Sequence, residues 1–197
     1  MQNLSKKSLH KLATKGLSKD TFIKEVGEDI EYYLELWHSQ GVSIVKKEGL
    51  YFFETKCTPI SEAVFCIVDI ETNGSKLTKH QIIEIAALKI KNNTVIDRFE
   101  TLVQCESINK AITQITGICV EDTTNAPSLQ TTMYKFKEFL ADAVFVAHDV
   151  EFDYNFISGT LKNLGLLPLL NRKLCSIDIA QRTLQSYRYG LKYLNEY

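Results

Sequence analysis

Two acidic side chains, Asp69 and Glu71, are the residues best placed to do chemistry in this chain of 197 residues. They follow an apolar run from Val64 to Val68, which predicts a short buried strand. Because alternate side chains of a strand share a face, the two carboxylates are expected side by side. Two carboxylates without a partner repel each other, so holding them side by side costs free energy. A hard divalent cation such as Mg²⁺ or Mn²⁺ removes that cost, because it binds carboxylate oxygens. The alternative is an ordinary strand end whose acids cap the helix that follows.

A third acid, Asp153, occurs at a second junction of the same kind. A predicted strand over 143–148 leads into a predicted helix over 151–165. Negative charge is favourable in the first turn of a helix, so Asp153 could serve only to stabilise the helix start. Its position at the rim of the sheet, where α/β proteins bind ligands, also allows it to join Asp69 and Glu71 in one metal cluster.

The elements that must position these acids follow from the hydrophobic pattern after residue 60. Three strands joined by short connections come first and predict an antiparallel meander, and helices then alternate with further strands. This order predicts an α/β fold with a mixed five-stranded sheet and helices on both faces. The expected strands are 64–69, 81–90, 94–104, 143–148 and 173–177, and the expected helices are 109–115, 127–140, 151–165 and 178–186, with the start of one more at 189–197.

The first 60 residues show a different pattern of predicted elements from the rest of the chain. They are expected to form a separate module, residues 1–60, ahead of a domain at 61–197. A short helix is expected around Leu4, Leu9 and Leu12, and two more over 18–26 and 29–39. Extended segments at 42–46 and 50–55 then predict a hairpin. Three helices and a hairpin resemble a winged helix, which is common in DNA-binding proteins.

The charge of the third helix argues against DNA binding through that helix. Glu28, Asp29, Glu31 and Glu35 lie at or near its start, and they would face phosphates with the wrong sign. The module is therefore interpreted as a small packing or protein-contact unit.

Composition narrows the class of partner and compartment. The net charge of −1 gives no general attraction to nucleic acid, so a DNA or RNA partner would have to be bound locally, through a metal or a small basic patch. No apolar run is long enough to cross a bilayer, and the basic N-terminus lacks the apolar segment of a secretory signal. The five cysteines are scattered without a CxxC pair, which indicates free thiols in a reducing, cytoplasmic environment.

Five motifs follow one another after residue 63: DIETNG from Asp69, QIIEIAALKI, ITQITGI, AHDVEFDYNFI and CSIDIAQRTLQSYRYGLKYL. In this order they resemble the motifs of the DnaQ-like 3′–5′ exonucleases. The resemblance covers about residues 63–197, and it is strongest to the branch that contains the proofreading (epsilon) subunits of bacterial replicative DNA polymerase. It implies a ribonuclease H-like fold.

The resemblance implies catalysis with two Mg²⁺ or Mn²⁺ ions. Asp69 would bridge both ions, Glu71 would help to hold the ion that carries the attacking water, and Asp153 would complete the cluster. These three acids are therefore both the candidate catalytic residues and the candidate metal ligands.

The same resemblance implies a substrate site for the 3′ end of single-stranded DNA. Thr72, Asn73 and Gly74 would lie against the terminal nucleotide, mainly through the backbone. His148 would lie near the scissile phosphate, although a packed histidine at a strand end is an equally good interpretation. The expected partner is the catalytic subunit of the replicative polymerase. The alternatives are trimming of RNA 3′ ends, or an exonuclease fold retained as a non-catalytic binding module.

This chain departs from the family pattern at three places. Asp149 stands where the family usually has Asn, which adds a negative charge near the site, and Thr116 stands where the family has a histidine. The general-base histidine and the last metal-binding aspartate of the family are expected beyond Tyr197. Because loss of a general base typically costs a factor of about 10²–10⁴, this chain by itself is expected to be a weak or inactive nuclease.

Overall fold

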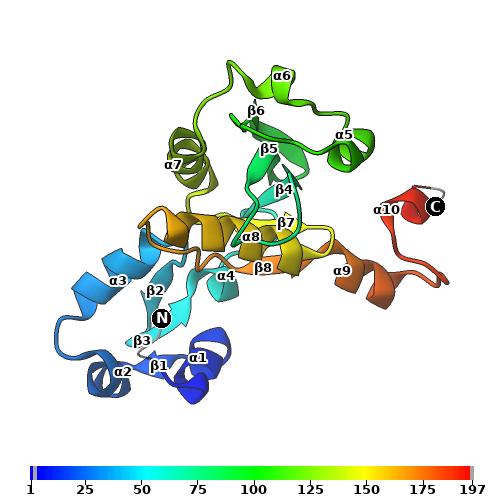
Figure 1. The fold of residues 1–197 in the computed structure, drawn as a ribbon. Helices are drawn as coiled ribbons and strands as arrows, with labels where there is room; N and C mark the ends of the chain where they lie inside the picture. The colour runs from blue at the N-terminus through cyan, green and yellow to red at the C-terminus, as the bar shows by residue number, and fades with distance from the viewer. Residues whose placement is uncertain (2–3, 196–197) are drawn as a thin grey trace.

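The computed structural model describes residue 1 and residues 4–195, and its ribbon has two parts (Figure 1). Over the described residues, the N-terminal part holds three helices, a small antiparallel sheet with the strand order β1-β3-β2, and a fourth, one-turn helix that follows the sheet. Its elements are α1 (Lys6–Ala13), β1 (Leu17–Ser18), α2 (Lys19–Val26), α3 (Ile30–His38), β2 (Ile44–Lys47) and β3 (Leu50–Phe53).

The three helices begin where the sequence contains capping side chains. Ser5, Ser18 and Asp29 each accept a hydrogen bond from the backbone N–H three residues later, which satisfies a donor that the helix itself leaves free. The predicted hairpin is confirmed, and it turns at Glu48 and Gly49, which both have positive φ. Strand β1 was not predicted, since its two residues are too short to give a pattern.

The core of this part is a buried cluster that contains several packed aromatic rings. Phe22 is fully buried, and its ring centroid lies 4.9 Å from that of Tyr51 and 5.8 Å from that of Trp37. The expectation that the chain stays extended to Thr55 is wrong, because Glu54–Cys57 forms the short helix α4. Its last turn closes when Thr58 N–H donates to the Glu54 carbonyl.

The second part is a mixed α/β layer structure, as the sequence predicted. Over the described residues its sheet has five strands in the order β6-β5-β4-β7-β8; β4, β5 and β6 pair antiparallel, whereas β4, β7 and β8 pair parallel. The elements are β4 (Val64–Thr72), β5 (Ile82–Lys91), β6 (Thr94–Leu102), α5 (Lys110–Thr116), α6 (Val120–Thr123), α7 (Leu129–Leu140), β7 (Val144–Ala147), α8 (Val150–Asn163), β8 (Lys173–Cys175), α9 (Ser176–Thr183) and α10 (Leu191–Leu194).

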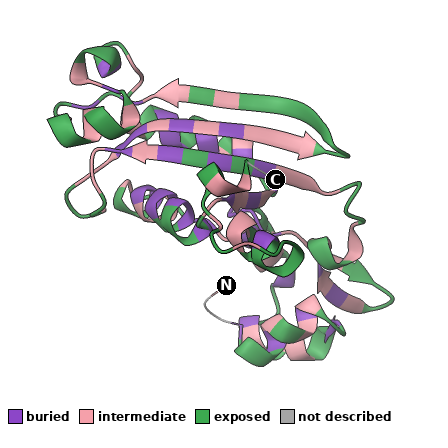
Figure 2. Cartoon of the chain, turned by 90° about the vertical axis from the view of Figure 1, so that its right-hand side faces the viewer, coloured by how far each residue is buried: buried purple, intermediate pink, exposed green. Residues whose placement is uncertain are grey.

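One face of this sheet is packed against α7 and α8. Cys66 and Val68 of β4 share a buried cluster with Phe136 of α7 and Ile157 of α8, and burial alternates along the strands (Figure 2). In Figure 1, α10 lies on the opposite side of β4–β6 from α7. The final predicted helix is thus present over Leu191–Leu194, and its last two residues, 196 and 197, lie outside the described residues.

The two parts are joined by a small polar seam. Leu170 N–H donates to the Gln40 carbonyl at 2.7 Å, and Ser43 Oγ donates to Asp142 Oδ2 at 2.8 Å. Gly41 has a φ of +91°, and a Cβ on it would come within 2.1 Å of Asn171 Oδ1. The close approach of the Asn171 side chain to this backbone therefore depends on a glycine at position 41.

Two general features complete the fold. All five cysteines lie in the described ranges and are free. No helix in residues 4–195 combines the length and apolar character that a bilayer crossing requires.

Candidate active site

Asp69 and Glu71 lie on the accessible face of the central strand β4. Val68 and Ile70 point into the core, whereas Ile67 on the other face is 43% exposed. Asp69 is exposed and Glu71 is half-buried on that same face. Ala86 of β5 is opposite Asp69 in the register, and its short side chain leaves the space in front of this carboxylate open.

Asp153 comes to the same strand from helix α8, which packs against the buried face of the sheet. It lies in the first turn of α8, is 5% exposed, and its Oδ1 accepts a hydrogen bond of 3.2 Å from the backbone N–H of Ile70. Ile70 is the residue between Asp69 and Glu71, so the fold brings the three predicted acids to one short stretch of β4. Burial, and then the negative charge of Asp69, raise the pKa of Asp153 from 3.8 to about 7.

A fourth acid, Glu84, was not singled out from the sequence. It lies directly opposite Glu71 in the antiparallel register of β4 and β5. Burial raises the pKa of Glu71, and the charges of Asp69 and Glu84 raise it further. Burial also raises the pKa of Glu84, with contributions from Glu100 and Asp69. The hairpin register, counted back from the turn at 92–93, was the signal that could have found Glu84.

The residues between β7 and α8 adopt a special backbone conformation. Asp149 has φ 63° and ψ 57°, which is the left-handed region that Asn and Asp tolerate better than other residues. This explains physically why Asp can stand where the family usually has Asn. The charge of Asp149 contributes to the raised pKa of Asp153, as the sequence suggested.

His148 precedes this turn and is fixed on one side only. Its Nδ1 is 2.8 Å from Ser176 Oγ at the start of α9. Its Nε2 is buried and has no hydrogen-bond partner among the described residues. A buried polar nitrogen without a partner costs free energy, so Nε2 is an atom that the described residues leave unsatisfied.

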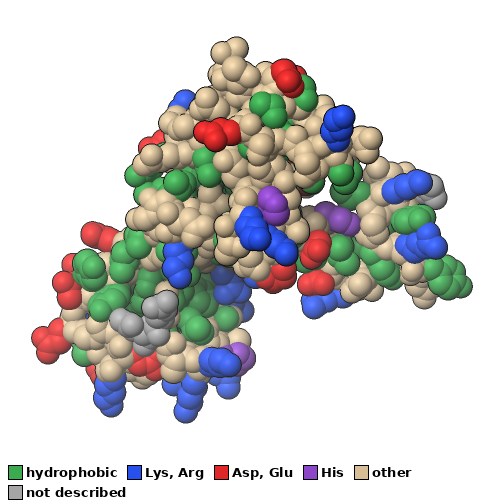
Figure 3. Space-filling model, viewed as in Figure 1, with side chains coloured by type: hydrophobic (Ala, Val, Ile, Leu, Met, Phe, Trp, Pro, Cys, Tyr) green, Lys and Arg blue, Asp and Glu red, His purple; other side chains and the backbone are tan. Residues whose placement is uncertain are grey.

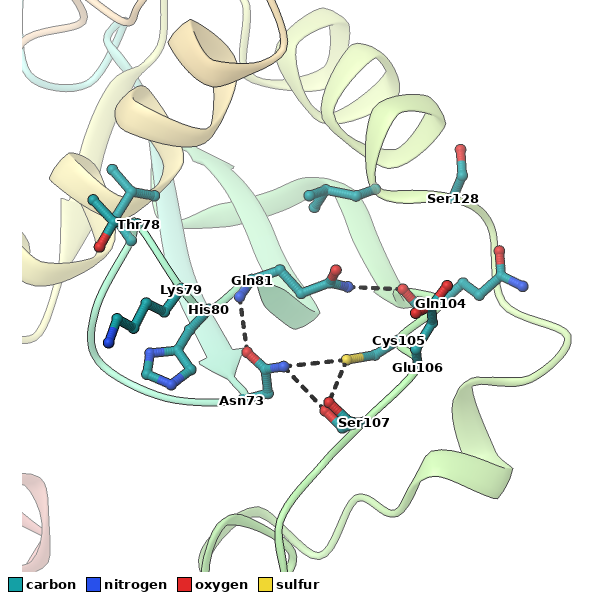
Figure 4. Close-up of a pocket in the computed structure, with 12 residues that line it drawn as sticks. Asn73, Thr78, Lys79, His80, Gln81, Gln104, Cys105, Glu106, Ser107 and Ser128 are labelled. Atoms are coloured by element: carbon teal, nitrogen blue, oxygen red, sulfur yellow. Dashed lines mark hydrogen bonds between the residues drawn. The ribbon is translucent and has the colours of Figure 1, made fainter.

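The loop after β4 is held by the side chain of Asn73 (Figure 4). Asn73 Oδ1 accepts a hydrogen bond of 2.8 Å from Gln81 N–H, and its Nδ2 donates to the Ser107 carbonyl at 3.0 Å. The Asn73 backbone N–H also donates to the Gln81 carbonyl at 3.0 Å, so both the side chain and the N–H of Asn73 hold the loop in place. Gly74 has a φ of +152°, and a Cβ there would lie 2.6 Å from the His80 ring. The loop borders a polar cavity of about 540 Å³.

A second, more apolar cavity of about 370 Å³ lies between this loop and α8. Leu77 extends from the loop toward α8, where Gly159 makes room for it, since a Cβ on Gly159 would come within 2.1 Å of Leu77 Cδ2. Phe152 is 40% exposed beside the cavity and offers an aromatic face. Phe152 and Leu77 were not singled out from the sequence. As apolar residues they could not be distinguished there from residues of the core.

The three acids are chemically suited to bind a hard divalent cation. Asp69, Glu71 and Asp153 supply carboxylate oxygens, which are the ligands that Mg²⁺ and Mn²⁺ prefer, and the raised pKa values of Glu71 and Asp153 show acids whose charges lack compensation. Within residues 4–195, however, no three His, Cys, Asp or Glu side chains are gathered closely enough to form a ready ion site. The residues that would hold the ions are thus present, and their side chains would have to turn toward one another.

Comparison with known proteins agrees with this fold. The exonuclease family RNase_T matches residues 66–197, and the chain belongs to that family. The resemblance to DnaQ-like exonucleases that the motifs indicated is thereby confirmed.

Proteins with a similar sequence include bacterial DNA polymerases III of the PolC type. The chain is 34% identical over 137 residues to the DNA polymerase III PolC-type of Staphylococcus haemolyticus, and 38% identical over 138 residues to that of Caldanaerobacter subterraneus. These alignments cover 68% and 69% of this chain. The chain spans about a tenth of the length of these relatives, since 10% of each is covered.

Solved structures with a similar fold include exonuclease I. A product-bound exonuclease I superposes with a TM-score of 0.61 at 14% identity, covering 68% of this chain and 38% of that one. E. coli exonuclease I in complex with a dT13 oligonucleotide gives 0.57 at 14% identity, with 61% and 29% covered. At this identity the likeness establishes the fold, and the expected ribonuclease H-like architecture is confirmed.

Proposed function

We propose that this chain is a metal-dependent 3′–5′ exonuclease that removes nucleotides from the 3′ ends of single-stranded DNA. The observation that carries the proposal is the hydrogen bond from Ile70 N–H to Asp153, which brings an acid of α8 to the strand that bears Asp69 and Glu71. A chain of the exonuclease family has no structural need to gather three acids here, since their mutual repulsion destabilises the folded state.

The three acids hold the ions in this proposal. Two Mg²⁺ or Mn²⁺ ions, when bound, activate water and stabilise the leaving oxygen in phosphodiester hydrolysis. Asp69 is exposed, Glu71 lies on the same face of β4, and the buried Asp153 is held at the backbone N–H of Ile70 between them, so these three acids would hold the ions. Ionisation of Asp153 is favoured once a cation is near, because positive charge lowers the pKa of a carboxyl group.

The surroundings of the acids position the substrate. The backbone of Thr72, Asn73 and Gly74 borders the terminal nucleotide, and Phe152 offers a face on which a base can stack in the cavity of about 370 Å³. In its Nε2–H form, His148 donates a hydrogen bond to a phosphate oxygen in this proposal, which gives this buried nitrogen the partner it lacks among the described residues. The biological role proposed for this activity is proofreading beside a replicative polymerase, as the PolC-type relatives suggest.

The test is degradation of a 5′-labelled single-stranded DNA oligonucleotide with Mg²⁺ or Mn²⁺. A ladder that shortens from the 3′ end is expected, and Asp69→Asn is expected to abolish it. The ladder should be faint, because no residue of this chain occupies the position of the family's general-base histidine. Asp97→Asn on β6 is the matched control, because it removes one exposed acid outside the site. An RNA oligonucleotide of the same sequence distinguishes DNA from RNA as the substrate.

A measurement that does not depend on turnover accompanies this assay. Mn²⁺ binding is followed by electron paramagnetic resonance in the parent chain, in Asp69→Asn and in Asp97→Asn. We expect weaker binding only in Asp69→Asn. Equal Mn²⁺ binding in all three proteins, together with no hydrolysis of DNA or RNA, would overturn the proposal in favour of a non-catalytic binding module.

A further inference from the structure

The N-terminal module, residues 1–57, has opposite charges on its two sides. Residues 1–27 contain six lysines against two acids, whereas residues 28–35 contain four acids and no lysine or arginine. In Figure 3 the basic side chains gather along the lower edge of this module, and acidic ones lie along its left side. Lys19 borders a cavity together with Glu28, Asp29 and Glu31. The other five lysines, which we call the lysine face, are Lys6, Lys7, Lys11, Lys15 and Lys24.

The packing of α1 directs its cations outward. Ser8 and Leu12 are the buried positions of α1, at 2% and 0% exposed, and they point toward the module core. Lys7 and Lys11 are four residues apart, so they lie next to each other on the outward side of the helix. The face continues past the end of α1 through Lys15, which is exposed.

The acids near the lysine face do not neutralise it. Glu25 accepts hydrogen bonds from Ser5 N–H at 2.8 Å and from Ser8 Oγ at 2.7 Å, so its oxygens hold α2 against the start of α1. No ion pair within residues 4–195 involves a lysine of this face. The charge of Lys11 helps to lower the pKa of Glu25, but neither it nor the other ammonium groups of the face is held in a close ion pair, so they can meet an external anion.

We propose that the lysine face binds the phosphate backbone of single-stranded nucleic acid, as a second contact for the strand whose 3′ end enters the active site. Exposed, flexible ammonium groups suit a repeating chain of phosphates, which they bind without reading sequence. The acids of α3 do not oppose this mode, because the strand meets α1 and Lys15 rather than the cavity where Lys19 lies beside Glu28, Asp29 and Glu31. This inference rests on the proposed function, which supplies the strand.

The seam between the two parts allows this contact to act on the active site. Gln40 of the module and Leu170 of the exonuclease part are joined by a backbone hydrogen bond, and the guanidinium of Arg172 lies 4.8 Å from the Phe53 ring centroid. A strand held by the module is thus held at a fixed place relative to the acids. Such a second contact lengthens the time for which a long strand stays bound.

The experiment measures binding without catalysis. Fluorescence anisotropy of a labelled 40-nucleotide single-stranded DNA is recorded in EDTA over a series of salt concentrations. The triple variant Lys7→Gln, Lys11→Gln and Lys15→Gln is expected to bind about tenfold more weakly at low salt. The slope of log K against log salt is expected to fall by about 2, since each lost phosphate contact on a single strand contributes about 0.7.

The matched control removes three exposed lysines from the other part of the chain, through Lys91→Gln, Lys135→Gln and Lys162→Gln. It has the same net charge as the first variant and is expected to bind like the parent chain. Equal loss in both triple variants would overturn the proposal, because it would show a response to net charge alone. Binding to phosphatidylserine vesicles with no binding to the oligonucleotide would also overturn it, in favour of a membrane surface.

Short substrates separate this inference from the proposed function. The lysine-face variant is expected to hydrolyse a 4-nucleotide DNA at the parent rate and to be slower only on the 40-nucleotide strand. If the parent chain hydrolyses neither DNA but binds the long strand in a salt-dependent way through the lysine face, the proposed function fails and this inference stands. If both proteins bind and hydrolyse the long strand equally, this inference fails and the proposed function stands.

Discussion

Replacing Asp153 with Asn is expected to stabilise the metal-free protein in a way that depends strongly on pH. Asp153 is 5% exposed, and burial followed by the charge of Asp69 raises its pKa from 3.8 to about 7. Asn has the same shape and can still accept the hydrogen bond from Ile70 N–H, but it never ionises. The variant therefore removes the cost of a buried charge and little else.

The sign follows from comparing the folded and unfolded states. Below pH 3.8 the carboxyl is protonated in both states, and Asp153 costs nothing. Between pH 3.8 and about 7 the unfolded state releases its proton while the folded state keeps it, so stability falls as pH rises. Above that window both states are ionised, and the loss is complete.

The size of the effect follows from the same two pKa values. A difference of roughly 3 between them corresponds to about 4 kcal/mol, at about 1.36 kcal/mol for each pKa unit. Between pH 5 and pH 8 about 3 kcal/mol of this should appear, because part of the cost is already present at pH 5. These values are upper estimates, since local relaxation reduces the cost of a buried charge.

Urea unfolding followed by circular dichroism in EDTA is the assay, at pH 5 and pH 8. The stability gained by Asp153→Asn should be larger at pH 8 by up to about 3 kcal/mol. Any cost of the new amide group is the same at both pH values and cancels in this difference. The control Asp97→Asn should change stability by less than about 0.5 kcal/mol at either pH. An Asp153→Asn effect of equal size at both pH values would refute the argument that a buried charge is being removed.

Three further predictions concern the packing around the site and its neighbour. Gly41→Ala should destabilise the protein by about 2–4 kcal/mol more than Gly49→Ala in urea unfolding, because both glycines have positive φ but only a Cβ at position 41 meets Asn171; equal losses would contradict it. Asn73→Ala should cost about 1–3 kcal/mol and speed hydrogen exchange in residues 74–81, while Asn163→Ala should not; unchanged exchange in both would show that the loop is held otherwise. Phe22→Ala should lower the stability of the N-terminal module by about 3–5 kcal/mol. The fluorescence change of the single tryptophan, Trp37, should then occur at a lower urea concentration than the loss of the helical signal of the other part. Loss of both signals together would show one cooperative unit.

The local elements of this protein were predictable because their signals lie within a few residues. The capping residues Ser18 and Asp29, and the turn at Glu48–Gly49, act on backbone groups no more than a few positions away. The alternation that puts Asp69 and Glu71 on one face of β4 is a property of any strand. The third acid, Asp153, was found only by combining its helix start with the first motif.

The short elements and the fourth acid were not predictable in the same way. Strand β1 exists because Leu17 and Ser18 pair with Tyr51 and Leu50, which are far away in the sequence. Glu84 became visible only through its register opposite Glu71. The helix at Glu54–Cys57 replaced an extended segment, since Phe53 of β3 is buried and the chain turns immediately after it.

The sequence by itself therefore determined the identities of the acids, the faces of the strands and the starts of the helices, because these depend on bonding between near neighbours. The tertiary structure decided which of these residues meet. It brings Asp153 to Ile70 across 83 positions of the chain, and it gives Asp153 a pKa of about 7 by burying it beside Asp69. Burial and charge proximity are properties of the packed sheet and helices together, and no local pattern of residues encodes them.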